Sequence, residues 1–253
     1  SDAVEFFRYA LQLGAEGVQT GLRGRDEATA RQIRALAEQA GAYYEGELRL
    51  PKTANDLAAF AREVRLTREA GATVARAVFT GGRRYELFKT REEFTRFHAE
   101  ARQSLALAEP ALRKHRLKVA IENHKDLTTE ELTTLMRQVA SEWIGVLVDT
   151  GNNLALLEEP QAVVDALVPF AASVHLKDMA VQPAATGFLL SEVRLGTGML
   201  DLPRIVRTLQ RANPTIVFNL EMATRDPLLV PCLTPGYWAT FPERRTTHLD
   251  AAL

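Results

Sequence analysis

Residues 118–124 read KVAIENH, an apolar run with the length of a buried β-strand that ends in polar side chains. The same pattern returns in three later segments, IGVLVDTGN (144–152), SVHLKD (173–178) and TIVFNLEM (215–222). Stretches with helical spacing separate these runs, and such alternation is typical of parallel strands joined by helices. In a parallel barrel the chemistry gathers at the carboxyl ends of the strands. The sequence therefore predicts a barrel with its site where the four runs end.

The rest of the chain continues the alternation of helices and strands. Strands are expected near 17–20, 42–48 and 73–79, and helices over 3–13, 26–40, 55–70, 91–114, 129–140, 160–169 and 202–211. With the four runs this makes seven strands, so we assign residues 1–253 to the α/β class, as a single (β/α)8 TIM-barrel domain that lacks its first strand. Because a helix comes first, the missing strand should precede Ser1.

Composition narrows the classes of partner. The chain has 31 basic and 32 acidic residues and a net charge of -1, which disfavours binding to nucleic acid or to an anionic membrane surface. A small, weakly charged or neutral ligand fits better. The single cysteine, Cys232, excludes an intrachain disulfide, and the sequence contains no apolar run long enough to span a membrane. We expect a cytoplasmic protein that acts on a small molecule, with a homo-oligomer as one option.

Four polar residues at the ends of the runs form a candidate metal site. Side chains alternate along a strand, so one face of each run can present its polar residue to the barrel interior. Three carboxylates and one imidazole favour Mn²⁺, Mg²⁺ or Co²⁺ over a thiolate-bound zinc ion. Taken singly, the aspartate could cap a turn and the histidine could be structural. Together the residues predict one divalent-metal site, and they are Glu122, Asp149, His175 and Glu221.

The interval between the last two candidate ligands is longer than one strand and one helix. It contains VQPAATGFLLSEVRLGTG (181–198), which is rich in β-branched residues and glycine. That composition predicts an extended loop or hairpin inserted before the next helix. We expect this insertion to lie over the site.

The motifs IENH, VDTGN, VHLKD, LGTG and LEM, in this order, resemble the sugar phosphate isomerase/epimerase superfamily with the xylose isomerase-like barrel, over nearly the whole chain. Its members include D-tagatose and D-psicose 3-epimerases, and the resemblance implies that one metal binds Glu122, Asp149, His175 and Glu221. Asn152 stands where those epimerases usually have a histidine. The segment EMATRDPLLVPCLTPGYWATF (221–241) resembles a subgroup that includes 3-oxo-isoapionate decarboxylase-like proteins.

The resemblance implies a metal-dependent sugar isomerase or epimerase that works through an enediolate, with decarboxylation of a 3-oxo sugar acid as the alternative. Glu122 and Glu221 are the candidate catalytic acid and base, and Lys177 is a candidate to stabilise the developing negative charge, unless it only pairs with Asp178 or Glu221. Two further classes are a non-catalytic sugar-binding subunit and an abasic-site endonuclease. The charge and the five histidines argue against the endonuclease.

Several other residues are candidate substrate contacts. Arg76 interrupts an apolar strand and either binds a substrate oxygen or pairs with an acid such as Glu47, which itself is either a pocket wall or a solvated strand end. His124 is either a substrate contact or a capping group. The arginines of TGGRRYE (80–86) either approach an anionic group or lie in a solvated loop. The substrate-binding candidates are thus Arg76, His124, Asn152, Arg194 and Glu47.

Overall fold

The computed structural model describes residues 2–223 and 226–241, so Thr224 and Arg225 of the C-terminal motif lie outside the described part. Seven strands form one sheet in the order β1-β2-β3-β4-β5-β6-β9, and the pairings that the structure records between them are parallel. This confirms the predicted barrel class. The strands are β1 Gly17–Gln19, β2 Tyr43–Glu47, β3 Val74–Ala77, β4 Lys118–Glu122, β5 Ile144–Asp149, β6 Ala171–Leu176 and β9 Phe218–Leu220.

Helices lie between the strands as predicted, with ends that differ by a few residues. They are α1 Ala3–Gln12, α2 Glu27–Ala40, α3 Leu57–Glu69, α5 Arg91–His115, α6 Thr129–Val139, α7 Pro160–Leu167 and α8 Leu202–Ala212. Two single turns, α4 Arg84–Leu87 and α9 Pro235–Trp238, and the 3-10 turns η1 Ala54–Asp56, η2 Asn152–Leu156 and η3 Val168–Phe170 complete the set in the described residues. Among the helices that the structure describes, none is long and apolar enough to cross a membrane.

The residues group into two compact units, and the first comprises Ser1–Val78, Ala101–Ile121 and Val139–Gly145. In it α1 packs on α2, and α2 packs on α3. Asp26 caps α2 by accepting a hydrogen bond from Thr29 N, and Gly41 ends that helix with a φ of 61°. A side chain at Gly46 of β2 would meet Thr67 Cγ2 of α3 at 2.2 Å, so the glycine permits this close packing of helix on strand.

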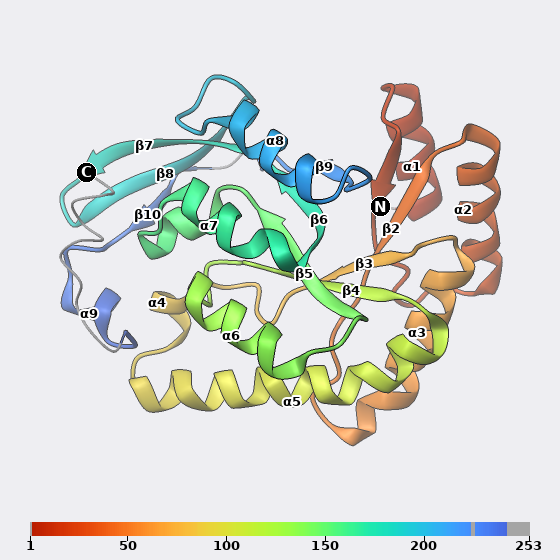
Figure 1. Cartoon of the computed structure of the whole chain (residues 1–253), viewed down its shortest axis with the longest axis horizontal. Helices are drawn as coiled ribbons and strands as arrows, with labels where there is room; N and C mark the ends of the chain where they lie inside the picture. The colour runs from red at the N-terminus through yellow and green to blue at the C-terminus, as the bar shows by residue number, and fades with distance from the viewer. Residues whose placement is uncertain (1, 224–225, 242–253) are drawn as a thin grey trace. The chain divides into compact units, whose positions relative to one another are not determined.

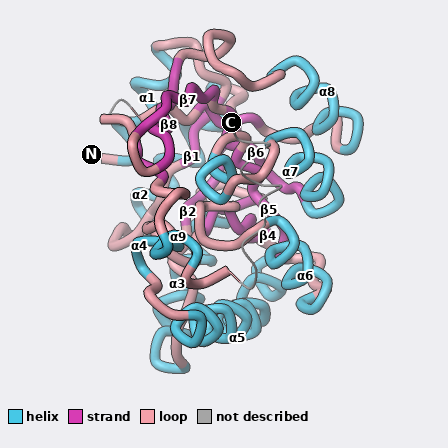
Figure 2. Tube along the Cα trace, turned by 90° about the vertical axis from the view of Figure 1, so that its left-hand side faces the viewer, coloured by secondary structure: helices cyan, strands magenta, loops and turns pink. Residues whose placement is uncertain are grey.

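The second unit comprises Phe79–Glu100, Glu122–Gln138 and Val146–Leu253 and contains all four candidate metal ligands. Its strand β5 is buried along its whole length, which explains its unbroken apolar sequence. The helices α6, α7 and α8 lie along the outside of β5 and β6 (Figure 2).

A separate antiparallel sheet follows β6 directly. Strands β7 Asp178–Ala184 and β8 Gly187–Val193 form the predicted hairpin, and β10 Leu228–Val230 adds a third strand to it (Figure 1). The sequence did not predict β10. Side chains of this sheet form an apolar cluster that includes Leu190, Val230, Tyr237 and Trp238, so the two aromatic residues are part of a core.

The LGTG motif forms a loop that Asp178 holds from inside. One carboxylate oxygen, Oδ2, accepts hydrogen bonds from Gly196 N at 2.9 Å and Gly198 N at 2.8 Å, and Oδ1 accepts one from Leu200 N at 3.2 Å. A side chain on Gly198 would lie 2.2 Å from Asp178 Oδ1, so the motif needs a glycine there. Asp178 is therefore engaged by the loop, and the structure gives Lys177 other partners.

Candidate metal and substrate site

The four predicted metal ligands meet at one place. Each offers one ligand atom, and these atoms lie within 4.8 Å of one another. Glu122 and Asp149 end β4 and β5, His175 lies near the end of β6, and Glu221 follows β9. The register places Asp149 opposite His175, and Glu221 N donates a hydrogen bond to Leu176 O at 3.1 Å. Parallel pairing therefore brings together residues that are far apart in the sequence.

Hydrogen bonds on both sides fix Asp149. The side chain of Asn123 accepts a hydrogen bond from Asp149 N at 2.7 Å and donates one to Asp149 O at 2.9 Å. The Oδ1 atom of Asp149 accepts hydrogen bonds from Gly151 N at 2.9 Å and Asn152 N at 2.7 Å. The turn-capping role considered for Asp149 is thus real, but it uses one carboxylate oxygen and leaves Oδ2 facing the cluster.

His175 lies among the three carboxylates. Its Nδ1 is 3.1 Å from Glu221 Oε2, 3.8 Å from Glu122 Oε1 and 4.0 Å from Asp149 Oδ2. Burial acts to lower the pKa of His175, but its contact with Glu221 and the charges of the carboxylates outweigh burial and raise that pKa. The imidazole thus lies in a strongly negative environment, which also attracts a metal cation.

Lys177 Nζ lies between two of the candidate ligands. It is 2.8 Å from Asp149 Oδ2 and 2.5 Å from Glu221 Oε2, and its side chain is 3% exposed. Burial acts to lower the pKa of Lys177, yet the charges of Asp149 and Glu221 raise it. Burial acts to raise the pKa of Glu221, but His175 and Lys177 lower it. Pairing with Glu221, one of the roles considered for Lys177, is therefore observed.

The residues present fit a divalent cation. Asp149 Oδ2 and Glu221 Oε2 are buried oxygens that make no hydrogen bond of good geometry, and Lys177 contacts them as an ion-pair partner. Two ligands that each lie about 2.1–2.3 Å from one ion are at most roughly 4.6 Å apart. The observed 4.8 Å limit therefore requires only small adjustments. Carboxylate oxygens with one imidazole nitrogen suit Mg²⁺, Mn²⁺ and related ions.

Asn152 and Lys125 extend the site beyond the four ligands. Asn152 Nδ2 donates a hydrogen bond to Glu122 Oε1 at 2.9 Å, and Lys125 Nζ donates one to Asn152 Oδ1. Asn152 is thus beside a candidate ligand, as expected for a residue three positions after Asp149. Sequence analysis missed Asn123 and Lys125 because it extended the strand to His124, whereas β4 ends at Glu122.

Glu192 was also missed. It lies on the hairpin strand β8, its Oε1 is 3.7 Å from Lys177 Nζ, and its Oε2 accepts a hydrogen bond from Ala223 N at 2.5 Å. The side chain is 6% exposed. Glu192 therefore joins the hairpin to Lys177 and to the segment that carries Glu221. Its position opposite Lys177 depends on the hairpin fold, for which a single sequence gives no side-chain signal.

The remaining substrate-binding residues predicted from the sequence are Arg76, Glu47, His124 and Arg194. Arg76 and Glu47 belong to the first unit, where they are opposite each other on β3 and β2 and form an ion pair of 3.3 Å. The ion pair considered for Arg76 is thus observed, and their role in substrate binding stays a prediction. His124 is half-buried just after β4, and Arg194 is exposed at the start of the glycine loop.

Sequence comparison agrees with this geometry. A family model described as the xylose isomerase-like TIM barrel matches residues 7–240. The chain belongs to this family. A 3-oxo-isoapionate decarboxylase from Pectobacterium atrosepticum is 27% identical over 113 residues, which are 44% of this chain and 41% of that protein. The match therefore covers less than half of the relative's length.

Solved structures share the fold of this xylose isomerase-like chain. D-psicose 3-epimerase from Clostridium cellulolyticum H10, in a structure with D-tagatose, has a TM-score of 0.67 and 12% identity, with 89% of this chain and 81% of that chain covered. A xylose isomerase-like TIM barrel protein from Mycobacterium smegmatis, in complex with magnesium, has a TM-score of 0.63 and 15% identity, with 98% and 87% covered. At these identities the similarity concerns the fold alone.

Proposed function

We propose that this protein is a divalent-metal-dependent sugar isomerase or epimerase that acts on a ketose or an oxidised sugar. The observation that carries the proposal is the convergence of Glu122, Asp149, His175 and Glu221 within 4.8 Å at the ends of parallel strands. The family, and relatives named as epimerases, support the same class. We propose Mn²⁺ as the resident ion, with Mg²⁺ or Co²⁺ as substitutes.

The chain's own residues divide the chemistry between them. A divalent ion held by the four ligands would supply the electrophile that polarises a sugar carbonyl. Glu122 or Glu221 takes the proton from the carbon next to that carbonyl, which leaves an enediolate, and the other carboxyl group returns a proton. Return to the opposite face of the same carbon inverts its configuration. Lys177, which lies beside Glu221, donates a hydrogen bond to the oxygen that gains negative charge.

A second candidate is the decarboxylation of a 3-oxo sugar acid. The specific observation in its favour is the 27% identity to a protein named 3-oxo-isoapionate decarboxylase. Loss of carbon dioxide from such an acid breaks the bond to the carboxylate carbon and leaves the electron pair as an enolate. The site that serves an enediolate would serve this enolate equally well, and a proton from the solvent or from Glu221 completes the reaction.

Product analysis tests the proposal. The Mn²⁺-loaded protein is incubated in D₂O with a panel of ketoses and 3-oxo sugar acids, and isomer ratios, deuterium uptake and carbon dioxide are followed. Epimerisation predicts a new isomer with one deuterium at the inverted carbon, and decarboxylation predicts carbon dioxide with deuterium in the product. Glu221→Gln should lose either activity. A chain that binds Mn²⁺ but gives no product with any of these compounds would support the sugar-binding subunit instead.

The proposal extends to the setting of the enzyme. We propose that it works in the cytoplasm on small-molecule carbohydrates, without a nucleic-acid or membrane partner. The support is the net charge of -1, which gives no field that would concentrate a polyanion.

A further inference from the structure

We propose that Glu192 is a positioning residue, which takes the ammonium of Lys177 away from Asp149 and Glu221 when a divalent cation binds. The inference rests on the proposed function, because it needs the divalent ion of the candidate metal site. It goes beyond that function by giving the inserted hairpin a part in the chemistry, since Glu192 lies on the hairpin strand β8.

The ammonium of Lys177 and a divalent cation compete for the same two oxygen atoms. Lys177 Nζ lies 2.8 Å from Asp149 Oδ2 and 2.5 Å from Glu221 Oε2, and both acids belong to the candidate metal cluster. Because Asp149 Oδ1 already accepts two backbone hydrogen bonds, Oδ2 is the oxygen that Asp149 offers to a cation. A cation at these oxygens takes up their negative charge and repels the nearby ammonium. The ammonium then needs another acceptor.

Glu192 is in position to be that acceptor. The Lys177 side chain is only 3% exposed, so an acid inside the protein has to replace the lost contacts. Of the acids that form ion pairs with Lys177 in the described residues, Glu192 is the one that is not a candidate metal ligand. Its Oε1 is 3.7 Å from Lys177 Nζ. A movement of the ammonium by about 1 Å converts this contact into a charge-assisted hydrogen bond.

The second oxygen of Glu192 fixes the side chain in place. Glu192 Oε2 accepts a hydrogen bond from Ala223 N at 2.5 Å, and Ala223 is two residues after Glu221. A carboxylate offers about four acceptor positions, so Oε1 can accept from Lys177 while Oε2 keeps its contact with the backbone. The acceptor is therefore held next to the segment that carries Glu221.

Moving the ammonium changes what two candidate catalytic residues can do. With Lys177 Nζ at 2.5 Å, the Oε2 atom of Glu221 is occupied by a donor. Transfer of the ammonium to Glu192 releases Glu221 for a metal ion and for proton transfer. Lys177 stays beside the site, where it can donate a hydrogen bond to the substrate oxygen that gains negative charge. Glu192 thus prepares both residues at the moment when the cation binds.

A double-mutant cycle on Mn²⁺ affinity tests the coupling between Glu192 and Lys177. Titration calorimetry measures the wild type, Glu192→Gln, Lys177→Met and the double variant. We expect Glu192→Gln to weaken Mn²⁺ binding by about 10-fold or more, because the ammonium then has no acid to move to and continues to compete with the ion. Glutamine keeps an oxygen that can accept from Ala223 N. In the Lys177→Met background the effect of Glu192→Gln should be smaller by about 5-fold or more.

A crystal structure of the Mn²⁺-loaded wild type measures the movement directly. We expect Lys177 Nζ within about 3.2 Å of Glu192 Oε1 and more than about 3.5 Å from Asp149 Oδ2 and Glu221 Oε2. An ammonium that stays on Asp149 and Glu221 would overturn the proposal. Equal effects of Glu192→Gln with and without Lys177 would overturn it too, because a purely structural role of Glu192 at Ala223 does not depend on the ammonium.

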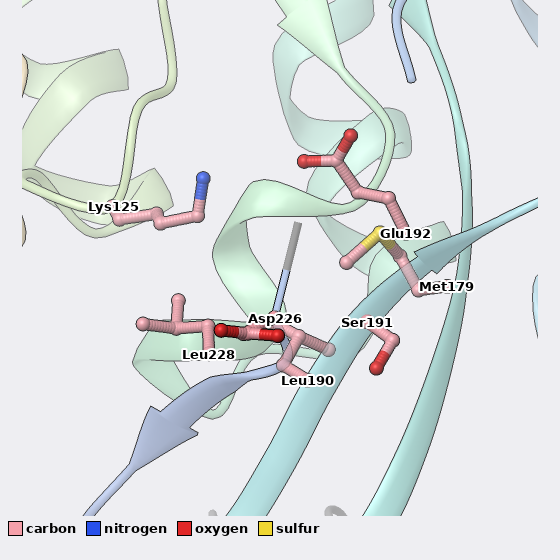
Figure 3. A pocket seen from close by; sticks show the side chains of 7 residues that line it. All are labelled: Lys125, Met179, Leu190, Ser191, Glu192, Asp226 and Leu228. Atoms are coloured by element: carbon pink, nitrogen blue, oxygen red, sulfur yellow. The ribbon is translucent and has the colours of Figure 1, made fainter. Parts of the chain in front are cut away.

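Asp226→Asn is the matched control. Asp226 lines the same hollow as Glu192 but is exposed, and Figure 3 shows its carboxylate apart from that of Glu192. Solvent screens its charge, so this variant should leave Mn²⁺ affinity within about 2-fold of the wild type. A wild-type protein that binds no Mn²⁺ would refute the proposed metal-dependent function. Normal Mn²⁺ binding with an additive cycle would refute the role of Glu192 alone.

Discussion

Two buried cations in the second unit have opposite surroundings. Arg84 is fully buried, pairs with Glu131 at 2.7 Å, donates hydrogen bonds to Thr240 Oγ1 and O, and stacks between the rings of Phe94 and Phe241. Burial lowers the pKa of this guanidinium, and Glu131 counteracts the effect. One cation with one acid and two neutral acceptors is an electrically balanced arrangement, and it joins α4 to the segment around α9.

Lys177 is the contrasting case, because negative charge exceeds positive charge around it. Asp149, Glu221 and Glu192 lie within 4.0 Å of its ammonium, and Glu122 lies next to His175. Buried carboxylates in such numbers are unfavourable for folding unless a further cation joins them. The comparison teaches that a balanced buried charge marks structure, whereas an excess of buried acid marks a place prepared for a ligand.

The largest expected effect on stability comes from replacing Arg84, the buried cation whose charge is balanced by Glu131. Arg84→Met should lower the free energy of unfolding by about 3–5 kcal/mol, because it leaves Glu131 and the Thr240 acceptors without their partner. Chemical denaturation measures this. The control is Arg83→Met, since Arg83 pairs with Glu86 in a more exposed position and should change stability by less than about 1 kcal/mol. Equal effects of the two variants would contradict a structural role specific to Arg84.

Removal of one carboxylate from the group around Lys177 should affect metal binding more than stability. Glu221→Gln is expected to weaken Mn²⁺ binding by about 100-fold or more, while metal-free stability changes by no more than about 1 kcal/mol, because the change reduces the excess of negative charge. Titration calorimetry and denaturation with and without Mn²⁺ measure the two quantities. Glu131→Gln, the matched change at Arg84, should show the reverse pattern. A large loss of metal-free stability for Glu221→Gln would break the contrast.

Asp126 interacts electrostatically with Arg84 and with Glu122, so its titration can be followed through the pH dependence of stability. Complete burial raises its pKa from 3.8 to about 7, and the charge of Glu122 adds to the rise. Because the folded-state pKa exceeds the unfolded one, the group reduces stability progressively as pH rises from about 3.8 to about 7. Asp126→Asn should therefore stabilise the protein by about 1–3 kcal/mol at pH 8 and by almost nothing near pH 4. Denaturation at a series of pH values gives the profile, and a pH-independent difference would rule out this titration.

The smallest expected effect concerns the exposed pair of the first unit. Glu47→Gln should change stability by less than about 1 kcal/mol, since the Glu47 side chain is 45% exposed and solvent screens its 3.3 Å contact with Arg76. Thermal denaturation at low and high salt checks this. If Arg76 binds substrate, as the sequence predicts, Arg76→Met raises KM with little change in kcat, whereas a purely structural pair changes neither.

The sequence predicted that these four residues lie close together because three of them lie at or near strand ends. Asp149 and His175 end apolar runs whose length and composition are characteristic of buried strands, and parallel pairing then fixes their neighbours. The hairpin was predicted from the composition of residues 181–198. Local pattern was sufficient in these cases, since strand periodicity and turn composition are properties of neighbouring residues.

What escaped prediction depends on contacts between distant residues. Arg84 was expected at a substrate or in a solvated loop, and it is fully buried because Glu131 and Thr240, 47 and 156 residues away in sequence, supply its partners. Strand β10 pairs with β8, and the paired residues Leu228 and Leu190 are also far apart in the sequence. Lys125 was missed because its inward direction depends on a left-handed backbone, which non-glycine residues rarely adopt. Single-sequence patterns contain little information on such features.

Lys177 is the single residue between the barrel strand β6 and the first hairpin strand, β7. The two ends of the hairpin, Asp178 and Val193, are paired with each other, so the chain leaves and re-enters the barrel at neighbouring points. An insertion with adjacent ends can lengthen, shorten or be exchanged for another without moving the strands that carry the ligands. Evolution can therefore vary the length of this hairpin while the barrel strands that position Glu122, Asp149 and His175 stay in place.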